Sequence, residues 1–473
     1  MKLRFLTRLE WLAFTTGFVL MTFELAAARV LAPTVGSSMY VWTSVIGVII
    51  AALSLGYYLG GRVADVRSRA SDVTWLLIAT AGLVALAAVF YPHVLPSLAA
   101  SQLDVRIQAV LAASLLFAPA SLALGMISPY LAKLNVTSLK TSGSAVAALS
   151  AWNSIGGITG TFLTGFFLFG WVGSRDIFII LVVVLLGSTL FLKQRWSKRH
   201  WLVGSASFVV VALASVNVSA FAIDTPSAHY TVFEWGNQGA RYRGLATGPS
   251  GVQSGVNIAN PYEPVFWYTK ELTKLIADTG QRSDILVLGG GTFTLPQQLG
   301  VEYPDARIDV VEIDPELANI AREHFFYQDP PNVQLIFEDA RHYVNQTDKQ
   351  YDIVVVDVYG DADVPFTLMT REYGEAVRRL IKPDGVVMAN MIAGAQGGCQ
   401  VLLSTLEAPY RQNFHHRALK LNSDDDAQRK IYNIIGVYSN NSLDYSGYGD
   451  VAVPKIAPYT DDFTPAERIR QNC

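Results

Sequence analysis

Three glycines, Gly289, Gly290 and Gly291, follow the four apolar residues after Asp284, and a stretch compatible with a helix comes next. Glycine has no Cβ, so a turn built from it bends sharply and lets the backbone approach a bound molecule. Glu312 lies 21 residues beyond Gly291, close to the spacing at which a carboxylate accepts hydrogen bonds from ribose hydroxyls. The combination predicts a site for a ligand that carries a ribose.

Two further carboxylates follow later apolar runs. Asp339 stands in FEDARHY, where it is suited either to cap a helix that begins at Ala340 or to contact an adenine. Asp357 follows four apolar residues in IVVVDV, and the loop after it carries Asp361 and Asp363, which are typical of a solvated loop. A carboxylate at the end of a central strand can hydrogen-bond an amine and accept its proton, so Asp357 is the predicted catalytic residue.

The glycine turn lacks the remaining signals of common nucleotide sites. Thr294 stands where a dinucleotide fingerprint has its third glycine, and no GxxxxGK[ST] sequence is present, so NAD and ATP are disfavoured. The two cysteines, Cys399 and Cys473, form no CxxC pair and no metal spacing with any of the seven histidines. We therefore expect no metal, and the cysteine spacing by itself indicates no compartment.

The elements that must position these residues follow from the hydrophobic pattern. From Asp284 the predicted strands are ILVLG, RIDVVEI, VQLIFE, YDIVVVDV and GVVMANMI, and the predicted helices are TLPQQLGVEY, PELANIAREHFF and REYGEAVRRLIK. This alternation implies a parallel sheet with helices on both faces, in which ligands bind at the carboxyl ends of the strands. Before it we predict the hairpin AHYTVFEW-GNQG-ARYRGLATG, a strand in GVQSGVNI and an amphipathic helix in EPVFWYTKELTKLIA.

The first half of the chain has a different composition. Hydrophobic residues make up 51% of the whole chain and charged residues only 16%, and the long uncharged runs lie before residue 223. Seven segments are long enough to cross a hydrocarbon core, namely 11–33, 40–61, 73–92, 107–132, 144–172, 174–192 and 201–223. We therefore predict an α-helical transmembrane bundle with the lipid bilayer as its partner. The net charge of −3 argues against a nucleic-acid partner.

Basic residues gather in alternate connections between these segments and mark the cytoplasmic side. They are Lys2, Arg4, Arg8, Arg62, Arg67, Arg69, Lys133, Lys140, Lys193, Arg195, Lys198 and Arg199. This distribution predicts a cytoplasmic N-terminus and, if all seven segments span, a second half on the outer face. A re-entrant or interfacial segment at 201–223 is the alternative, and it would leave the second half in the cytoplasm.

Residues 226 to about 395 resemble spermidine synthase and related polyamine aminopropyltransferases. The matching phrases are GGG at 289, VVEIDP at 310–315, EDAR at 338, the Asp357 loop and VQS at 252. Over nearly its full length the chain resembles the bacterial membrane-fused members of that group. The implied architecture is a transmembrane domain (1–223) of about seven helices in the inner membrane, a small β-unit (224–262) and a Rossmann-like, methyltransferase-type α/β domain (263–473).

The resemblance implies a role for each candidate residue. The donor would be decarboxylated S-adenosylmethionine, and the acceptor a polyamine or another amine. Glu312 would bind the ribose hydroxyls, Asp339 with Ala340 the adenine, and the turn 289–291 the sulfonium side chain. Asp357 would handle the amine nucleophile. The implied substrate-binding residues are Gln253, Tyr268 and Tyr230. A homodimer is compatible with this family.

Departures from the family pattern keep other functions open. The family usually follows its glycines with Asp-Gly, whose Asp contacts the aminopropyl nitrogen, but this chain has Thr292-Phe293. The family's Tyr-His-Glu is replaced by Tyr268-Thr269-Lys270. Aminopropyl transfer is the predicted function, and methyl transfer from S-adenosylmethionine is the alternative reaction. A membrane sensor or transporter that binds a nucleoside or polyamine without turnover is the alternative outside enzymes.

Overall fold

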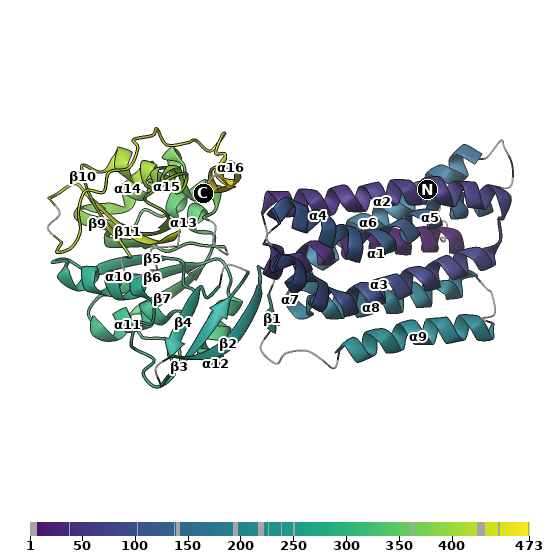
Figure 1. The fold of residues 1–473 in the computed structure, drawn as a ribbon, viewed down its shortest axis with the longest axis horizontal. Helices are drawn as coiled ribbons and strands as arrows, with labels where there is room; N and C mark the ends of the chain where they lie inside the picture. Colours follow the sequence, from purple (N-terminus) through teal and green to yellow (C-terminus); the bar gives the residue numbers. More distant parts are fainter. Residues whose placement is uncertain are drawn as a thin grey trace. The chain divides into compact units, whose positions relative to one another are not determined.

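The chain divides into two compact units, Met1–Tyr230 and Thr231–Cys473 (Figure 1). The first unit is helical, and the second is built on β-sheets. The computed structural model describes residues 7–36, 38–101, 103–136, 138, 142–192, 197–215, 222–225, 227–237, 239–248, 251–360, 364–422, 431–442, 445–471 and 473. The expected domain boundaries after residues 223 and 262 remain predictions.

Long helices make up the first unit. Its elements are α1 (Arg8–Val35), α2 (Met39–Val66), α3 (Ala70–Ala99), α4 (Val105–Leu116), α5 (Ala118–Asn135), α6 (Ser142–Leu163), the π-helix η2 (Thr164–Leu168), α7 (Phe169–Trp171), α8 (Ser174–Ser188), the 3-10 helix η3 (Thr189–Leu192), α9 (Lys198–Ser215) and the short strand β1 (Ala222–Asp224).

The span count differs from the seven predicted segments. Among the described residues, five helical stretches are long and apolar enough to cross a membrane. They are Arg8–Ala32, Met39–Val66, Ala70–Ala99, Ser142–Trp171 and Ser174–Leu192. The predicted segment 107–132 is a pair of helices, α4 and α5, bent by 53°, and it makes a sixth span only if the pair is one crossing. The predicted segment 201–223 corresponds to α9, which is less apolar because it begins with Lys198, Arg199 and His200.

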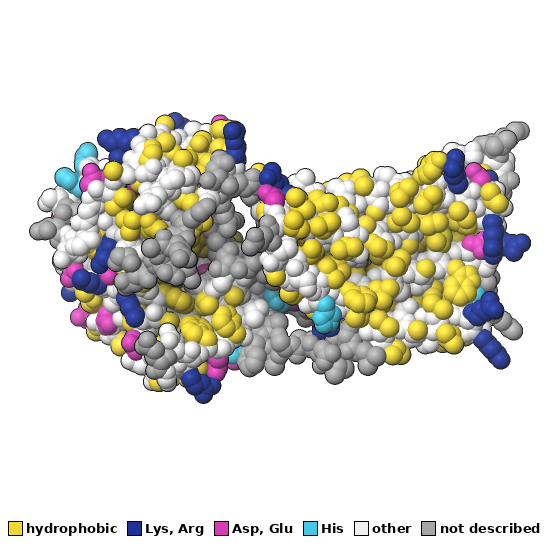
Figure 2. Space-filling model, in the orientation of Figure 1, with side chains coloured by type: hydrophobic (Ala, Val, Ile, Leu, Met, Phe, Trp, Pro, Cys, Tyr) yellow, Lys and Arg dark blue, Asp and Glu magenta, His cyan; other side chains and the backbone are white. Residues whose placement is uncertain are grey.

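The outer surface of the helical unit is apolar. Large hydrophobic side chains remain exposed along it, including Ile50 at 54%, Leu115 at 62%, Ile158 at 58% and Phe166 at 71%. Figure 2 shows a broad hydrophobic surface on the visible face of this unit, with Lys and Arg side chains gathered at one end. Exposed apolar area of this extent is compatible with insertion into a membrane.

Two sheets organise the second unit. The small antiparallel sheet contains β2 (His229–Asn237), β3 (Ala240–Ala246) and β4 (Ser254–Asn257). The large sheet has the order β10-β11-β9-β8-β5-β6-β7. Its strands are β5 (Asp284–Leu288), β6 (Arg307–Glu312), β7 (Val333–Phe337), β8 (Tyr351–Val356), β9 (Ile381–Ala393), β10 (His416–Leu421) and β11 (Tyr432–Ser439). The predicted hairpin and all five predicted strands are present.

Helices cover both faces of the large sheet. They are α10 (Trp267–Asp278), α11 (Thr294–Glu302), α12 (Glu316–His324), α13 (Ala340–Gln346), the 3-10 helix η4 (Phe366–Leu368), α14 (Arg371–Leu380), α15 (Cys399–Asn413) and α16 (Ala466–Gln471). The helices α13, α14 and α15 are neighbours over one face, and α10 and α11 are neighbours over the other (Figure 1). Every residue of β8 is buried, as expected for a strand covered on both faces.

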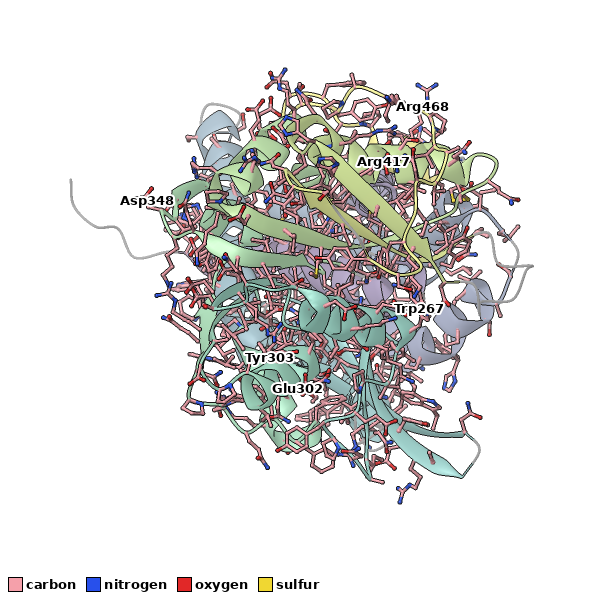
Figure 3. The ribbon with its side chains drawn as sticks, turned by 90° about the vertical axis from the view of Figure 1, so that its left-hand side faces the viewer. Trp267, Glu302, Tyr303, Asp348, Arg417 and Arg468 are labelled. Carbon is pink, nitrogen blue, oxygen red and sulfur yellow. A yellow bond between two sulfur atoms is a disulfide. The ribbon has the colours of Figure 1, made fainter. Side chains whose placement is uncertain are left out.

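The edge of the sheet departs from the predicted all-parallel arrangement. The strands β5 to β9 pair in parallel, but β11 pairs antiparallel with β9, and β10 antiparallel with β11. Figure 3 shows this edge with Arg417 on β10, and Trp267 at the beginning of α10. The C-terminal unit therefore has a Rossmann-like fold with an antiparallel hairpin at one side.

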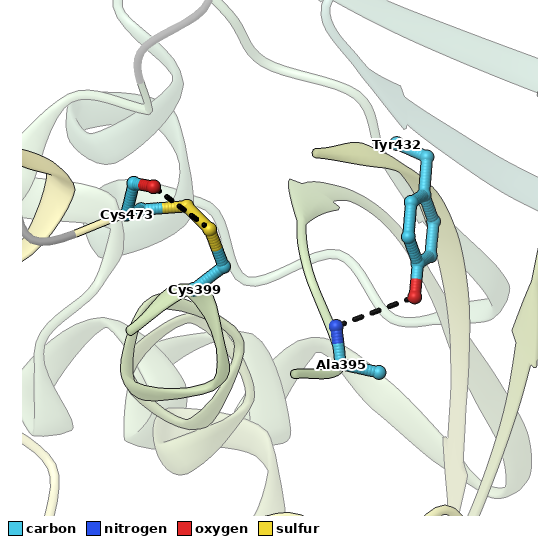
Figure 4. The surroundings of a disulfide bond; sticks show 4 residues. All are labelled: Ala395, Cys399, Tyr432 and Cys473. Atoms are coloured by element: carbon cyan, nitrogen blue, oxygen red, sulfur yellow. Dashed lines mark hydrogen bonds between the residues drawn. A yellow bond between two sulfur atoms is a disulfide. The ribbon is translucent and has the colours of Figure 1, made fainter. Parts of the chain in front are cut away.

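A disulfide joins the beginning of α15 to the end of the chain (Figure 4). Cys399 and Cys473 are 74 residues apart in the sequence. Beside the bond, the Ala395 N–H donates to the hydroxyl of Tyr432 over 3.3 Å. The cysteine spacing alone did not indicate this pairing.

We expect Cys473→Ser to lower the free energy of unfolding of the C-terminal unit by about 4 kcal/mol, because the unfolded chain would no longer contain a closed loop of this length. The measurement is the thermal unfolding midpoint of the full chain in detergent, with and without reductant. Reductant should lower the midpoint of the natural chain and leave that of the variant unchanged. Equal midpoints for all four samples would contradict the expectation.

Candidate active site

The candidate residues lie on one edge of the large sheet. Four neighbouring strands, β8, β5, β6 and β7, end there in parallel. In this spatial order their ends carry Asp357, the turn 289–291, Glu312 and Asp339. The chain leaves β5 toward β6 and β7 on one side and returns to β8 on the other. Ligands bind at such a reversal of strand order in open α/β sheets.

The glycine turn requires glycine for two physical reasons. Gly289 and Gly291 have positive φ angles of 95° and 52°, which other residues rarely adopt. A Cβ at Gly289 would also overlap the carbonyl oxygen of Asp357. The turn is held between its neighbours, since the Gly289 N–H donates to the carbonyl of Val311 and the Asp357 N–H to that of Leu288, each over 2.9 Å.

Glu312 points its carboxylate at this turn. Its Oε2 accepts a hydrogen bond from the Gly290 N–H at 2.8 Å, and its Oε1 accepts one from the Asp314 N–H at 3.1 Å. The side chain is only 8% exposed, and this burial raises the pKa of Glu312 although the backbone N–H groups favour its ionised form. The structure therefore places the Glu312 carboxylate beside the glycines, and its role toward a ribose remains a prediction.

Asp357 occupies a half-buried position that changes its acidity. Its Oδ1 accepts a hydrogen bond from the Asn390 amide at 2.8 Å, and the hydroxyl of Tyr268 also hydrogen-bonds to the carboxylate. Burial raises the pKa of Asp357 to about 6, while these two donors act in the opposite direction. Such a carboxylate can accept a proton near neutral pH.

Asn390 was missed in the sequence, and it belongs to a chain of hydrogen bonds behind Asp357. Its own Oδ1 accepts from the Asn433 amide at 2.9 Å, and its backbone carbonyl accepts from the Tyr359 hydroxyl at 2.9 Å. Asn390 is 5% exposed. The available signal was an amide inside the apolar run GVVMANMI, because a buried amide needs partners.

The predicted substrate residues Gln253 and Tyr268 both contact the region of Asp357. The Gln253 amide donates to the carbonyl of Gly360 at 2.6 Å, and Thr247 donates to the same carbonyl at 2.8 Å. The Tyr268 hydroxyl lies 3.2 Å from the backbone carbonyl of Gln253. These bonds tie the loop after β8 to the small sheet. The side-chain amide of Gln253 thus supports the site through Gly360.

Tyr230 belongs to the other compact unit of the chain. It is the last residue of the first unit and is 4% exposed within β2, so its substrate role remains a prediction. Asp361 and Asp363, which we expected in a solvated loop, lie outside the described residues.

Asp339 caps α13, as one of its two interpretations predicted. Its carboxylate accepts from the His342 N–H at 2.9 Å, and Ala340 begins the helix. The cap orients the Asp339 side chain. The segment also lies next to Glu312, because the neighbouring Glu338 N–H donates to the carbonyl of Glu312 at 3.0 Å. Recognition of adenine by Asp339 and Ala340 remains a prediction.

Thr292 and Phe293 fasten the glycine turn to its surroundings. The Thr292 and Ser254 hydroxyl oxygens are 2.6 Å apart, which ties the turn to β4. Phe293 has a positive φ of 56° and is fully buried, with its ring centroid 5.2 Å from that of Tyr327. Thr292 and Phe293 therefore hold the glycine turn in place by a hydrogen bond and by packing, and neither residue supplies a carboxylate there.

A small and largely apolar cavity borders Asn390 between the ends of β8 and β9 and the helix α15. Its lining includes Val356, Val358, Ala389, Asn390, Met391 and Tyr410. A cavity of this composition would accept methylene groups more readily than charges.

Within the residues that the structure describes, no group of three His, Cys, Asp or Glu side chains could hold a metal ion.

Fold and site together define a Rossmann-like domain with carboxylates at the ends of successive strands. Residues 265–415 match the family model of the spermine/spermidine synthase domain. The C-terminal region of the chain therefore carries a spermine/spermidine synthase domain.

Individual relatives match part of the chain. The chain is 34% identical over 109 residues to a polyamine aminopropyltransferase of Vibrio vulnificus, covering 22% of this chain and 36% of the relative. It is 31% identical over 156 residues to a probable polyamine aminopropyl transferase of Bifidobacterium longum, covering 33% and 34%. The chain thus spans about a third of the length of these curated relatives. A solved structure of a probable spermidine synthase from Corynebacterium glutamicum is 22% identical, with a TM-score of 0.42 over 49% of this chain and 83% of that chain.

Proposed function

We propose that the C-terminal unit transfers an aminopropyl group from decarboxylated S-adenosylmethionine to an amine. The observation that carries this proposal is the order of groups along one sheet edge, with Asp357, the glycine turn, Glu312 and Asp339 on adjacent strands. The match of residues 265–415 to the spermine/spermidine synthase domain supports it. The amine acceptor, of the polyamine class, is part of the same proposal.

Each group has a role in this proposal. Glu312 accepts hydrogen bonds from the ribose hydroxyls, and Asp339 with Ala340 contacts the adenine. The glycine turn leaves room for the sulfonium side chain. As the amine nitrogen bonds to the propyl carbon, the carbon–sulfur bond breaks, its electron pair stays on sulfur, and Asp357 accepts the proton from nitrogen. A sulfonium already leaves readily, so the enzyme mainly holds the amine in line with the carbon under attack.

The first unit would anchor this activity to the bacterial inner membrane with a cytoplasmic N-terminus. The apolar surface and the apolar lengths of its helices support the anchor, and the basic connections support the orientation. A homodimer remains a prediction.

A methyl transfer from S-adenosylmethionine is the second candidate. It is favoured by Thr292, whose hydroxyl is held by Ser254 and which supplies no carboxylate for an aminopropyl ammonium group. The same sheet edge would bind the adenosyl part in both reactions. The sensor or transporter without turnover is the candidate that remains if neither donor reacts.

A turnover assay with two labelled donors distinguishes these functions. The full chain, purified in detergent, is mixed with a diamine and with either decarboxylated S-adenosylmethionine labelled in its propyl group or S-adenosylmethionine labelled in its methyl group. We expect label to enter the diamine only from the decarboxylated donor. Label from the methyl donor alone would establish the second candidate, and label from neither would leave binding without turnover.

We expect Asn390→Ala to move the acidic limb of the rate profile to higher pH by about one unit. Asp357 accepts a proton only when ionised, so the rate rises with pH through a pKa of about 6 in the natural chain. Removing a donor to the carboxylate favours its protonated form, which raises that pKa further. The measurement is kcat/KM of transfer against pH.

The matched control is Asn441→Ala, which removes an asparagine that donates to the exposed Asp384 at 2.7 Å. Its profile should stay in place. If Asn390→Ala loses rate equally at every pH and its acidic limb does not move, Asn390 does not lower the pKa of Asp357.

A further inference from the structure

The connections that carry the basic residues lie at one end of the helical unit, which we term the basic end. Contacts between the helix ends show this arrangement. Lys133 in the last turn of α5 pairs with Asp65 near the end of α2 at 2.7 Å. Trp11 in the first turns of α1 stacks on Phe191 in η3, with ring centroids 6.4 Å apart. The start of α1 and the ends of α2, α5 and η3 therefore belong to the basic end.

The helix α9 begins at the basic end and runs parallel to α3. Trp75 near the start of α3 lies against His200 near the start of α9, with ring centroids 4.4 Å apart. Two turns further along both helices, a Cβ at Gly82 would lie 3.2 Å from the Ser207 hydroxyl. From the first contact to the second, each helix advances by seven residues in the same direction. The helix α9 is therefore uninterrupted over this stretch and runs away from the basic end alongside α3.

Asp224, beyond α9, lies at the opposite end of the unit. Its Oδ2 accepts from the backbone N–H of Ser174, the first residue of α8, at 2.9 Å. The apolar stretch Ser174–Leu192 starts at that residue and finishes at the basic end. Asp224 also pairs with His229 at 2.8 Å and lies 3.6 Å from Arg29 in the second half of α1. His200 and Asp224 therefore lie at opposite ends of the helical unit.

The disulfide gives an independent indication of compartment. The chain has two cysteines, and they pair with each other as Cys399–Cys473 in the C-terminal unit. Disulfides persist in oxidising compartments and are rare in the cytosol, where thiols are kept reduced. A unit with this bond is expected on the side of the membrane opposite to the basic connections.

We propose that α9 crosses the membrane and that the chain from Asp224 onward, including the whole spermine/spermidine synthase domain, lies on the outer, oxidising side. The charged beginning of α9 then stays at the cytoplasmic surface, where Lys198 and Arg199 follow the positive-inside rule. Counting the bent pair α4 and α5 as one crossing, the chain crosses seven times with α9, so its two ends lie on opposite sides. The re-entrant alternative for residues 201–223 does not agree with the parallel contacts of α9 and α3 within its described part.

One consequence rests on the proposed function. If the domain transfers an aminopropyl group, its acceptor is an amine that is present on the outer side, and the adenosyl donor has to be delivered there by a transport step. The sequence of events is then synthesis of the donor in the cytoplasm, its export, and transfer outside.

Reporter fusions to the full chain test the orientation. Alkaline phosphatase, which is active only after export, and green fluorescent protein, which folds to its fluorescent form in the cytoplasm, are each attached after Cys473. The same two reporters are inserted between Leu192 and Ser197 as the matched control. We expect at least tenfold more phosphatase activity from the C-terminal position than from the loop, and the reverse order for fluorescence. The opposite pattern, or equal signals at both positions, would overturn the proposal.

Thiol trapping in intact cells gives a second readout that needs no catalytic activity. Cells are quenched with acid, and the denatured chain is treated with a maleimide that carries a polyethylene glycol tag. The natural chain should take up no tag unless it is first reduced, after which it should take up two, and Cys473→Ser should take up one without reduction. Two tags on the unreduced natural chain would place the domain in the cytosol. Orientation and function are separable, because both tests can succeed in a chain that proves to transfer no group.

Discussion

Replacing Asp357 with asparagine should lower the rate of group transfer by about 10²- to 10⁴-fold, the usual contribution of a positioned general base. Asparagine keeps the size of the side chain and can still contact Asn390, but it cannot accept the proton that the amine releases. Affinity for the donor should stay within about twofold, since Glu312 and Asp339 hold the adenosyl part in our proposal. The measurement is turnover with labelled donor together with donor binding by calorimetry.

The Asp357→Asn result has to be compared with the same substitution at a second acid of the unit. Asp384→Asn removes an acid that accepts from Asn441 on the surface of the same unit, and it should leave transfer unchanged. Retained turnover in Asp357→Asn would show that another group takes the proton or that none is needed. Loss of donor binding together with turnover would show that the substitution disturbs the fold of the edge.

Replacing Gly289 with alanine should destabilise the C-terminal unit by about 2–5 kcal/mol and abolish donor binding. Alanine at a φ of 95° is strained, and its Cβ would push against the carbonyl of Asp357. The push separates the ends of β5 and β8, between which the reacting groups are expected to meet. The measurements are the thermal unfolding midpoint and a titration with donor.

Gly280→Ala is the matched control, because a Cβ at this exposed glycine meets no atom within 4 Å. It should leave both the midpoint and the donor affinity unchanged. A Gly289→Ala chain that binds donor normally would mean that the turn does not approach the ligand.

Much of the site could be predicted because it depends on local sequence patterns. A strand that ends in glycines and the next strand ending in Glu312 place a turn and a carboxylate side by side in any parallel sheet of this kind. A helix cap is one of the two interpretations that the sequence allows for Asp339 before ARHYVN, and the structure shows that cap. The roles of these residues toward a ligand depend on chemistry that the fold alone does not test.

Other features depend on contacts between distant residues, which periodicity does not encode. The partner of Cys399 is 74 residues away, and Asn433, which supports Asn390, comes from a strand that pairs antiparallel to the rest of the sheet. In the sequence, Thr292 differs from a family pattern, and no local signal explains why. Its reason lies in Ser254, on a strand of the small sheet. Residue pairs that are this far apart in the sequence can be identified only from the three-dimensional arrangement of the strands.

The most direct test of the account is calorimetric titration of decarboxylated S-adenosylmethionine into the natural chain and into Glu312→Gln, at a pH well above 6. Glutamine keeps the length of the side chain but cannot accept two hydrogen bonds as an anion. We expect the natural chain to bind the donor, and we expect Glu312→Gln to bind it about 10- to 100-fold more weakly, as befits the loss of charged hydrogen bonds. Equal affinity in the two proteins, or no binding by either, would contradict the claim that this sheet edge holds an adenosyl donor.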